Sequence, residues 1–229
     1  MTMKKLLAGS VLALTATGVA AIPSDLADLK NDSGSKLLPD VPQDTYYDTG
    51  AGYVSLTDTS GLQDDSNAEL LAESADLETG NSFGIFDPEN GNELTLFSGT
   101  DTKGTGVTVK FDVSGGTAKN QTTGASEMIG TTFGFFIDNG NGNKFYSDPD
   151  MNDSLDPALI YDTTGTSGEG LSGANLVVAF EDQQVGDRDY NDMVVGLTDV
   201  VAEVPEPGTL ALFGIGLLGL GVSRFRQAA

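Results

Sequence analysis

The stretch that decides the fold class is Val107-Thr108-Val109-Lys110-Phe111-Asp112-Val113. Apolar and polar side chains alternate through it with a period of two, which predicts a β-strand with one face buried and the other in water. Short apolar runs of similar length recur on both sides of it, separated by clusters of Gly, Asn, Asp and Ser. This spacing is typical of an antiparallel β-sandwich, so the chain is predicted to be all-β.

The neighbouring runs extend this strand pattern in both directions. Residues 83–86 and 94–97 flank Asp87-Pro88-Glu89-Asn90-Gly91-Asn92, a turn sequence that predicts a β-hairpin. We expect the strands to form an antiparallel β-sandwich with a jelly-roll-like arrangement. The remaining predicted strands are residues 53–56, 132–137, 144–146, 158–161, 176–180 and 193–197.

One short helix is predicted within this β pattern. Ser66-Asn67-Ala68-Glu69 has the form of a capping box, in which the first and last side chains satisfy free backbone amides at a helix start. The apolar residues that follow would cover an edge or a face of a sheet. They are Leu70, Leu71, Ala72, Ala75 and Leu77.

The chain divides into four predicted segments. Residues 1–21 are a signal peptide, because Lys4 and Lys5 precede an uncharged apolar run that ends in small residues. A permanent anchor is disfavoured, since the small residues end the run where an anchor would continue. Residues 22–50 are polar and contain three prolines, as in an irregular arm or linker. Residues 51–201 form one acidic sandwich domain, and residues 202–229 form a sorting tail.

Composition limits the chemistry of the domain. The chain has 34 acidic and 11 basic residues, and residues 22–204 keep 33 of the former and 7 of the latter, a formal charge of −26. Such a surface repels nucleic acid and attracts cations. Cys, His and Trp are absent. Disulfides, thiolate metal sites and imidazole catalysis are therefore excluded, and oxygen ligands for hard cations remain.

The C-terminal tail has three parts in a fixed order. Pro205-Glu206-Pro207 precedes an uncharged span, and Arg224 and Arg226 follow it. The apolar part, residues 210–222, is shorter than the ~17–25 residues that usually span a bilayer, and the arginines would hold its end on the cytoplasmic side. A buried helix at a domain end fits poorly, because the run is apolar on every side. We expect a hydrophobic sorting helix.

This tail resembles the PEP-CTERM sorting signal of exported proteins in Gram-negative bacteria. The resemblance implies that a membrane-embedded exosortase recognises the Pro-Glu-Pro region of an inner-membrane precursor and removes the tail. Proteins with this signal tend to occur beside genes for extracellular polysaccharide, which implies a cell-surface or biofilm-matrix destination. The expected partners are exosortase, the secretion machinery and extracellular polysaccharide.

Two loops repeat the pattern D-x-D-x-N-D, which brings side-chain oxygens to alternate positions as in calcium-binding EF-hand loops. They are not EF-hands, because Asp192 and Asp153 stand where that motif has Gly. Carboxylates from neighbouring strands could complete a Ca²⁺ site, whereas the alternative is that these residues serve turn chemistry and solubility. The candidate ligands are Asp187, Asp189, Asn191 and Asp192, Asp148, Asp150, Asn152 and Asp153, together with Asp138, Glu181 and Asp182.

The acidic motif also resembles a bacterial family known as a domain of unknown function, common in exported proteins. The residues that carry the resemblance are Phe180-Glu181-Asp182 and Gly186-Asp187-Arg188-Asp189-Tyr190-Asn191-Asp192, with Phe-rich stretches at 83–87 and 133–138. It extends over about residues 80–201 and implies an exported β-sandwich with a calcium site. It supplies no biochemical activity.

Three functions are compatible with these features. The leading hypothesis is a non-enzymatic surface or matrix protein that binds calcium. The alternative is a polysaccharide-binding module, although six Tyr and no Trp offer few rings for stacking on sugars. A glycoside hydrolase or lyase with a carboxylate pair is disfavoured, because nothing marks one pair among so many acids. We expect no enzymatic activity.

Overall fold

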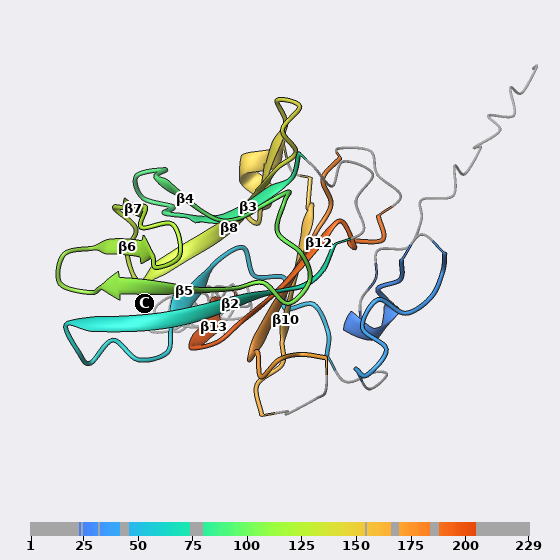
Figure 1. Ribbon diagram of the computed structural model, residues 1–229, viewed down its shortest axis with the longest axis horizontal. Helices are drawn as coiled ribbons and strands as arrows, with labels where there is room; N and C mark the ends of the chain where they lie inside the picture. The colour runs from blue at the N-terminus through green and yellow to red at the C-terminus, as the bar shows by residue number, and fades with distance from the viewer. Residues whose placement is uncertain are drawn as a thin grey trace, which may run out of the picture.

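The computed structural model describes residues 23, 25–31, 33–41, 46–73, 80–153, 155–165, 170–183 and 188–204. They form two antiparallel sheets packed face to face (Figure 1). The first sheet has the order β13-β1-β8-β3-β4, with β9 also paired to β8, and the second has the order β10-β11-β12-β2-β5-β6-β7.

The strand bounds of the first sheet are β1 Val54–Leu56, β3 Ser82–Phe86, β4 Glu93–Ser98, β8 Thr132–Asp138, β9 Lys144–Tyr146 and β13 Val200–Ala202. Those of the second sheet are β2 Gln63–Glu73, β5 Gly106–Asp112, β6 Thr117–Asn120, β7 Ser126–Glu127, β10 Ala158–Asp162, β11 Leu176–Phe180 and β12 Met193–Leu197. Two short 3-10 helices are η1 Leu26–Asp28 and η2 Pro149–Asn152.

The main core lies between the sheets and is built on aromatic contacts that cross it. Phe111 of β5 stacks on Phe133 of β8, with ring centroids 5.3 Å apart. Phe83 of β3 meets Phe180 of β11 edge to face at 6.0 Å. Offset stacked and edge-to-face ring pairs are favourable arrangements, and each pair joins one sheet to the other.

The predicted all-β antiparallel sandwich is confirmed at the level of two antiparallel sheets. In β5 the residues Val107, Val109 and Phe111 are buried while Lys110 is exposed, as the period of two predicts. The hairpin of β3 and β4 also forms, and Asp87 accepts hydrogen bonds from the amides of its turn. The jelly-roll-like arrangement stays a prediction. The signal peptide and the sorting helix lie outside the described residues.

The predicted helix that starts at Ser66 is wrong, because residues 66–73 belong to strand β2, while Ala75 and Leu77 lie outside the described residues. β2 pairs with β12 on one side and with β5 on the other. Ser66, Ala68 and Leu70 are buried on the core side, which is the period of two and not that of a helix. A bulge at Leu71 then shifts the register, so Ala72 as well as Leu71 packs in a second cluster on the outer face. Two strand neighbours outweigh a local capping signal, because helix propensity is a weak preference.

The second cluster covers the outer face of the second sheet. Every residue of β11 and β12 is buried, so these strands need apolar cover on both faces. Residues 25–48 supply part of that cover through Leu26, Leu29 and Leu38 (blue in Figure 1). The described part of this segment is mostly irregular, and its buried apolar side chains belong to the packed structure.

Replacing Leu29 by Ala tests this cover. Leu29 is fully buried, so the cavity left behind should lower the free energy of unfolding by about 2–5 kcal/mol in a urea titration. The control is Leu62→Ala, because Leu62 is 75 % exposed and its loss should change stability by less than about 0.5 kcal/mol. Equal effects of the two variants would contradict the packing described.

Candidate cation site

Acidic residues converge where β11 ends and β12 begins. Phe180 and Met193 are paired across these strands, so the residues that follow one and precede the other emerge side by side. The backbone N–H of Asp182 donates to Oδ2 of Asp192 at 2.6 Å. Glu181 and Asp182 are buried, and Asp192 is partly exposed.

Asp182 is fully buried and held by two asparagines from the other sheet. The Asn81 side-chain amide donates to Asp182 Oδ2 at 2.9 Å, and the Asn139 amide donates to the Asp182 carbonyl at 3.0 Å. The remaining oxygens, Asp182 Oδ1 and Asn81 Oδ1, are buried and accept no hydrogen bond from any residue that the structure describes. Buried oxygens without donors are costly, so this pair suits a cation or a bound water.

The electrostatics of the acidic residues around Asp192 also favour a bound cation. Burial, together with the negative charges of Asp182, Glu181 and Asp189, raises the pKa of Asp192 well above that of a free carboxyl. Within the described ranges no three carboxylates lie close enough to hold a metal by themselves. Amide and carbonyl oxygens such as that of Asn81 are, however, normal calcium ligands. We refer to Asn81, Asp182 and Asp192 as the cation site.

The rest of this loop is positioned by its own hydrogen bonds. Glu181 Oε1 accepts from the N–H of Tyr190 at 2.7 Å, and the Tyr190 hydroxyl donates to the Asp156 carbonyl at 2.7 Å. The Asn191 amide donates to Asp189 Oδ2 and to the Lys30 carbonyl. These bonds tie the loop to the N-terminal segment. Asp187 lies outside the described residues.

The second acidic loop folds as a structural turn. Asp148 caps η2 by accepting from the N–H of Asp150 at 2.9 Å, and its other oxygen accepts from the Tyr53 hydroxyl. Asn152 accepts from the N–H of Tyr146 at 2.8 Å and donates to the carbonyl of the same residue at 2.7 Å. Asp150 and Asp153 are exposed. The structure therefore gives Asp148 and Asn152 separate partners rather than one shared centre, and turn chemistry explains both.

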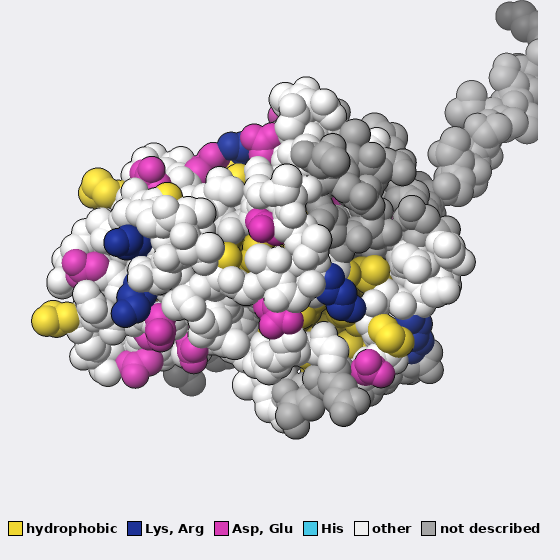
Figure 2. Space-filling view, in the orientation of Figure 1, with side chains coloured by type: hydrophobic (Ala, Val, Ile, Leu, Met, Phe, Trp, Pro, Cys, Tyr) yellow, Lys and Arg dark blue, Asp and Glu magenta, His cyan; other side chains and the backbone are white. Residues whose placement is uncertain are grey.

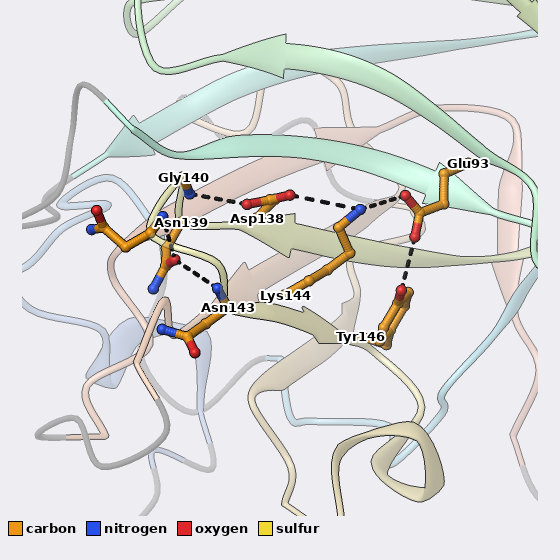
Figure 3. A network of polar contacts seen from close by, with 8 residues as sticks. Glu93, Asp138, Asn139, Gly140, Asn143, Lys144 and Tyr146 are labelled. Atoms are coloured by element: carbon orange, nitrogen blue, oxygen red, sulfur yellow. Dashed lines mark hydrogen bonds and ion pairs between the residues drawn. The ribbon is translucent and has the colours of Figure 1, made fainter.

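Asp138 belongs to a different polar network, on the outer face of the first sheet (Figure 3). Its side chain accepts from the N–H of Gly140 at 2.9 Å and lies 3.7 Å from Lys144 Nζ. Lys144 and the Tyr146 hydroxyl both bind Glu93, and burial together with this Glu93 contact raises the pKa of Tyr146 to about 12. The structure does not bring Asp138 to the cation site.

Sequence reasoning missed Asn81 and Asn139. Ser82 of β3 is paired with Asp138 of β8, so Asn81 and Asn139 leave the same end of the first sheet, opposite Asp182. Neither belongs to an acidic motif. The available signal was their position next to predicted strand ends, which becomes informative only once the pairing of those strands is known.

Comparison with known proteins identifies the tail. Residues 203–227 match the PEP-CTERM protein-sorting motif. The motif marks an exported, cell-surface-directed protein that is processed by exosortase, and it includes Pro205, Glu206, Pro207, Arg224 and Arg226, all outside the described residues. Searches of curated proteins and of solved structures found no match. The resemblance of residues 80–201 to a domain of unknown function stays a prediction.

The part of the chain that the structure describes contains no helix long and apolar enough to cross a membrane.

The charge of Asp192 predicts a pH dependence in the absence of divalent cations. Since its pKa is raised in the folded state, the folded protein binds the proton more tightly than the unfolded chain. Stability in chelator should therefore be highest at mildly acidic pH and should fall as the pH rises from about 5 to 8. Asp192→Asn should flatten this slope and raise the Tm at about pH 8 by a few degrees, whereas Asp150→Asn should not. If Asp192→Asn left the slope of stability against pH unchanged, the pH dependence would not come from Asp192.

The contact between Asn191 and Lys30 predicts that the loop holds the N-terminal segment in place. Asn191→Ala should remove that hydrogen bond and speed amide hydrogen exchange in residues 25–31 several-fold. Asn92→Ala is the matched control, because Asn92 bonds to the carbonyl of Met128 in another part of the molecule. The same exchange in both variants would show that other contacts hold the segment.

Proposed function

We propose that this chain is a non-enzymatic cell-surface or biofilm-matrix protein of a Gram-negative bacterium, with a sandwich domain that binds Ca²⁺ at the cation site. The PEP-CTERM match supports export and exosortase processing. The calcium assignment rests on one observation: Asp182 Oδ1 and Asn81 Oδ1 are buried, come from residues that are hydrogen-bonded to each other, and have no donor among the described residues.

The donor set favours calcium over other metals. The chain contains no Cys or His, so its side-chain metal ligands are oxygens, which suit hard cations. Ca²⁺ accepts 6–8 oxygens in irregular geometry, including amide and backbone carbonyl oxygens and water. Mg²⁺ demands a near-ideal octahedron and releases its water reluctantly. A net charge of −23 raises the local concentration of any cation.

Export places this domain where calcium is available. The precursor is held at the inner membrane by the tail, exosortase removes the tail, and the mature domain reaches the surface or the matrix. Asp and Glu side chains are spread over the visible face rather than gathered in one patch (Figure 2), so the charge on this face is diffuse. A specific response to calcium must therefore come from the cation site and not from surface charge in general.

The experiment is thermal unfolding of the protein purified from cells that express the full chain, in chelator, Ca²⁺ or Mg²⁺. Extracellular calcium modules bind at ~10⁻⁴–10⁻³ M, so about 10 mM Ca²⁺ should add about 1.4–2.7 kcal/mol. This corresponds to a rise in Tm of about 3–10 °C for a domain of this size. The same concentration of Mg²⁺ should give a smaller shift.

Asp182→Asn separates the site from the surface charge. The variant keeps an acceptor for the Asn81 amide but loses the buried charge, so it should be more stable than the wild type in chelator and should lose the Ca²⁺ shift. The matched control Asp150→Asn removes one exposed charge and should keep the shift. An equal shift from Mg²⁺, or an unchanged Ca²⁺ shift in Asp182→Asn, would refute calcium binding at this site.

A further inference from the structure

The chain contains three Asn-Gly pairs: Asn90-Gly91, Asn139-Gly140 and Asn141-Gly142. In such pairs the glycine nitrogen can attack the side-chain amide of the asparagine, because glycine has no side chain to hinder the approach. The reaction requires an asparagine side chain that can rotate and a glycine amide that is not engaged elsewhere. The three pairs are equivalent in sequence, and their hydrogen bonds distinguish them.

The side chain of Asn90 is held by hydrogen bonds in the β3–β4 turn. Its side-chain nitrogen donates to the Met128 carbonyl at 3.2 Å, and its side-chain oxygen accepts from the N–H of Asn92 at 2.8 Å. The attacking group is engaged as well, since the N–H of Gly91 donates to the Asp87 carbonyl at 2.8 Å. These bonds must break before the ring can close.

The side chain of Asn139 is more restricted than that of Asn90. It is only 2 % exposed, its amide donates to the Asp182 carbonyl, and its side-chain oxygen accepts from the N–H groups of Asn141 and Asn143 at 3.0 and 3.3 Å. The N–H of Gly140 donates to Asp138 Oδ1 at 2.9 Å (Figure 3). Both reacting groups are therefore engaged with other partners.

Asn141 differs on each point. Its side chain is exposed and makes no hydrogen bond to any other described residue, and the same holds for the N–H of Gly142. Gly142 is exposed, has a φ of +91°, and would have nothing within 4 Å of an added Cβ. The turn between β8 and β9 leaves room for the side chain to rotate toward the glycine nitrogen.

We propose that Asn141 is a site of spontaneous deamidation in the folded protein. The Gly142 nitrogen bonds to Asn141 Cγ, the Cγ–Nδ2 bond breaks, and ammonia leaves with the proton from the glycine amide. Water then opens the resulting succinimide at either carbonyl, which yields aspartate or isoaspartate at position 141. Each product adds one negative charge to the turn, and isoaspartate lengthens its backbone by one carbon. The inference is independent of calcium binding.

The test is to incubate the protein purified from cells that express the full chain at mildly alkaline pH, native and in denaturant, and to map peptides by mass. Deamidation replaces an NH₂ group by OH, and the isoaspartyl form is separated by chromatography. In the native protein Asn141 should react about tenfold or more faster than Asn90 and Asn139, since the latter must first break several hydrogen bonds. In denaturant the three rates should approach one another, because the sequences are alike.

Two variants complete the test. Asn141→Ser should remove most of the native-state product, whereas Asn90→Ser should leave it unchanged. Equal native rates at the three sites, or a faster reaction at Asn90 or Asn139, would overturn the proposal. So would an Asn141 that reacts in denaturant and is stable in the native protein.

Discussion

The pairing of β11 with β12 is the interaction on which the rest of the structure depends. Both strands lie inside the second sheet and are buried along their whole length, on both faces. One face packs into the core between the sheets, and the other requires the cover of residues 25–48. The same pairing places Phe180 opposite Met193, and so brings Asp182 beside Asp192. The register of β11 against β12 therefore determines both the packing of the core and the position of the candidate site.

This arrangement creates an electrostatic problem at the strand ends. A strongly acidic chain has several carboxylates directly beyond its most apolar strands, and at Asp192 desolvation and the neighbouring negative charges both oppose ionisation. Asparagines at the ends of first-sheet strands satisfy some of the oxygens, and others have no donor within the part of the chain that the structure describes. A bound cation would neutralise the charge and bind the oxygens that have no hydrogen-bond donor. Because these oxygens come from both sheets, the cation would join the two sheets at this end.

The two D-x-D-x-N-D loops illustrate how far a motif can be interpreted. The two loops have the same sequence pattern. In the loop at 148–153, however, the side chains stabilise the turn itself, and Asn152 is hydrogen-bonded to the backbone of Tyr146. In the other loop Asp192 lies beside Asp182, which is hydrogen-bonded to Asn81 at a strand end of the other sheet. Similarly, Ser66-Asn67-Ala68-Glu69 has a valid capping pattern, but it lies between β5 and β12 and forms a strand. A local sequence pattern does not show which distant residues will form hydrogen bonds with its backbone or its carboxylates.

Sequence alone determined the class of the fold, the export tail and the kind of ligand chemistry available. Alternation in residues 107–113, the turn at 87–92 and the order of parts after Pro205 are local features, and each acts through residues close together in the chain. The absence of Cys and His restricts side-chain metal ligands to oxygen without any knowledge of structure. Only the tertiary structure decided that residues 66–73 form a strand, that Asn81 meets Asp182, and that the Asn139 side chain is buried and hydrogen-bonded while that of Asn141 is exposed. The physical reason is that burial and hydrogen-bond partners come from segments distant in sequence, which only the packing of the two sheets brings together.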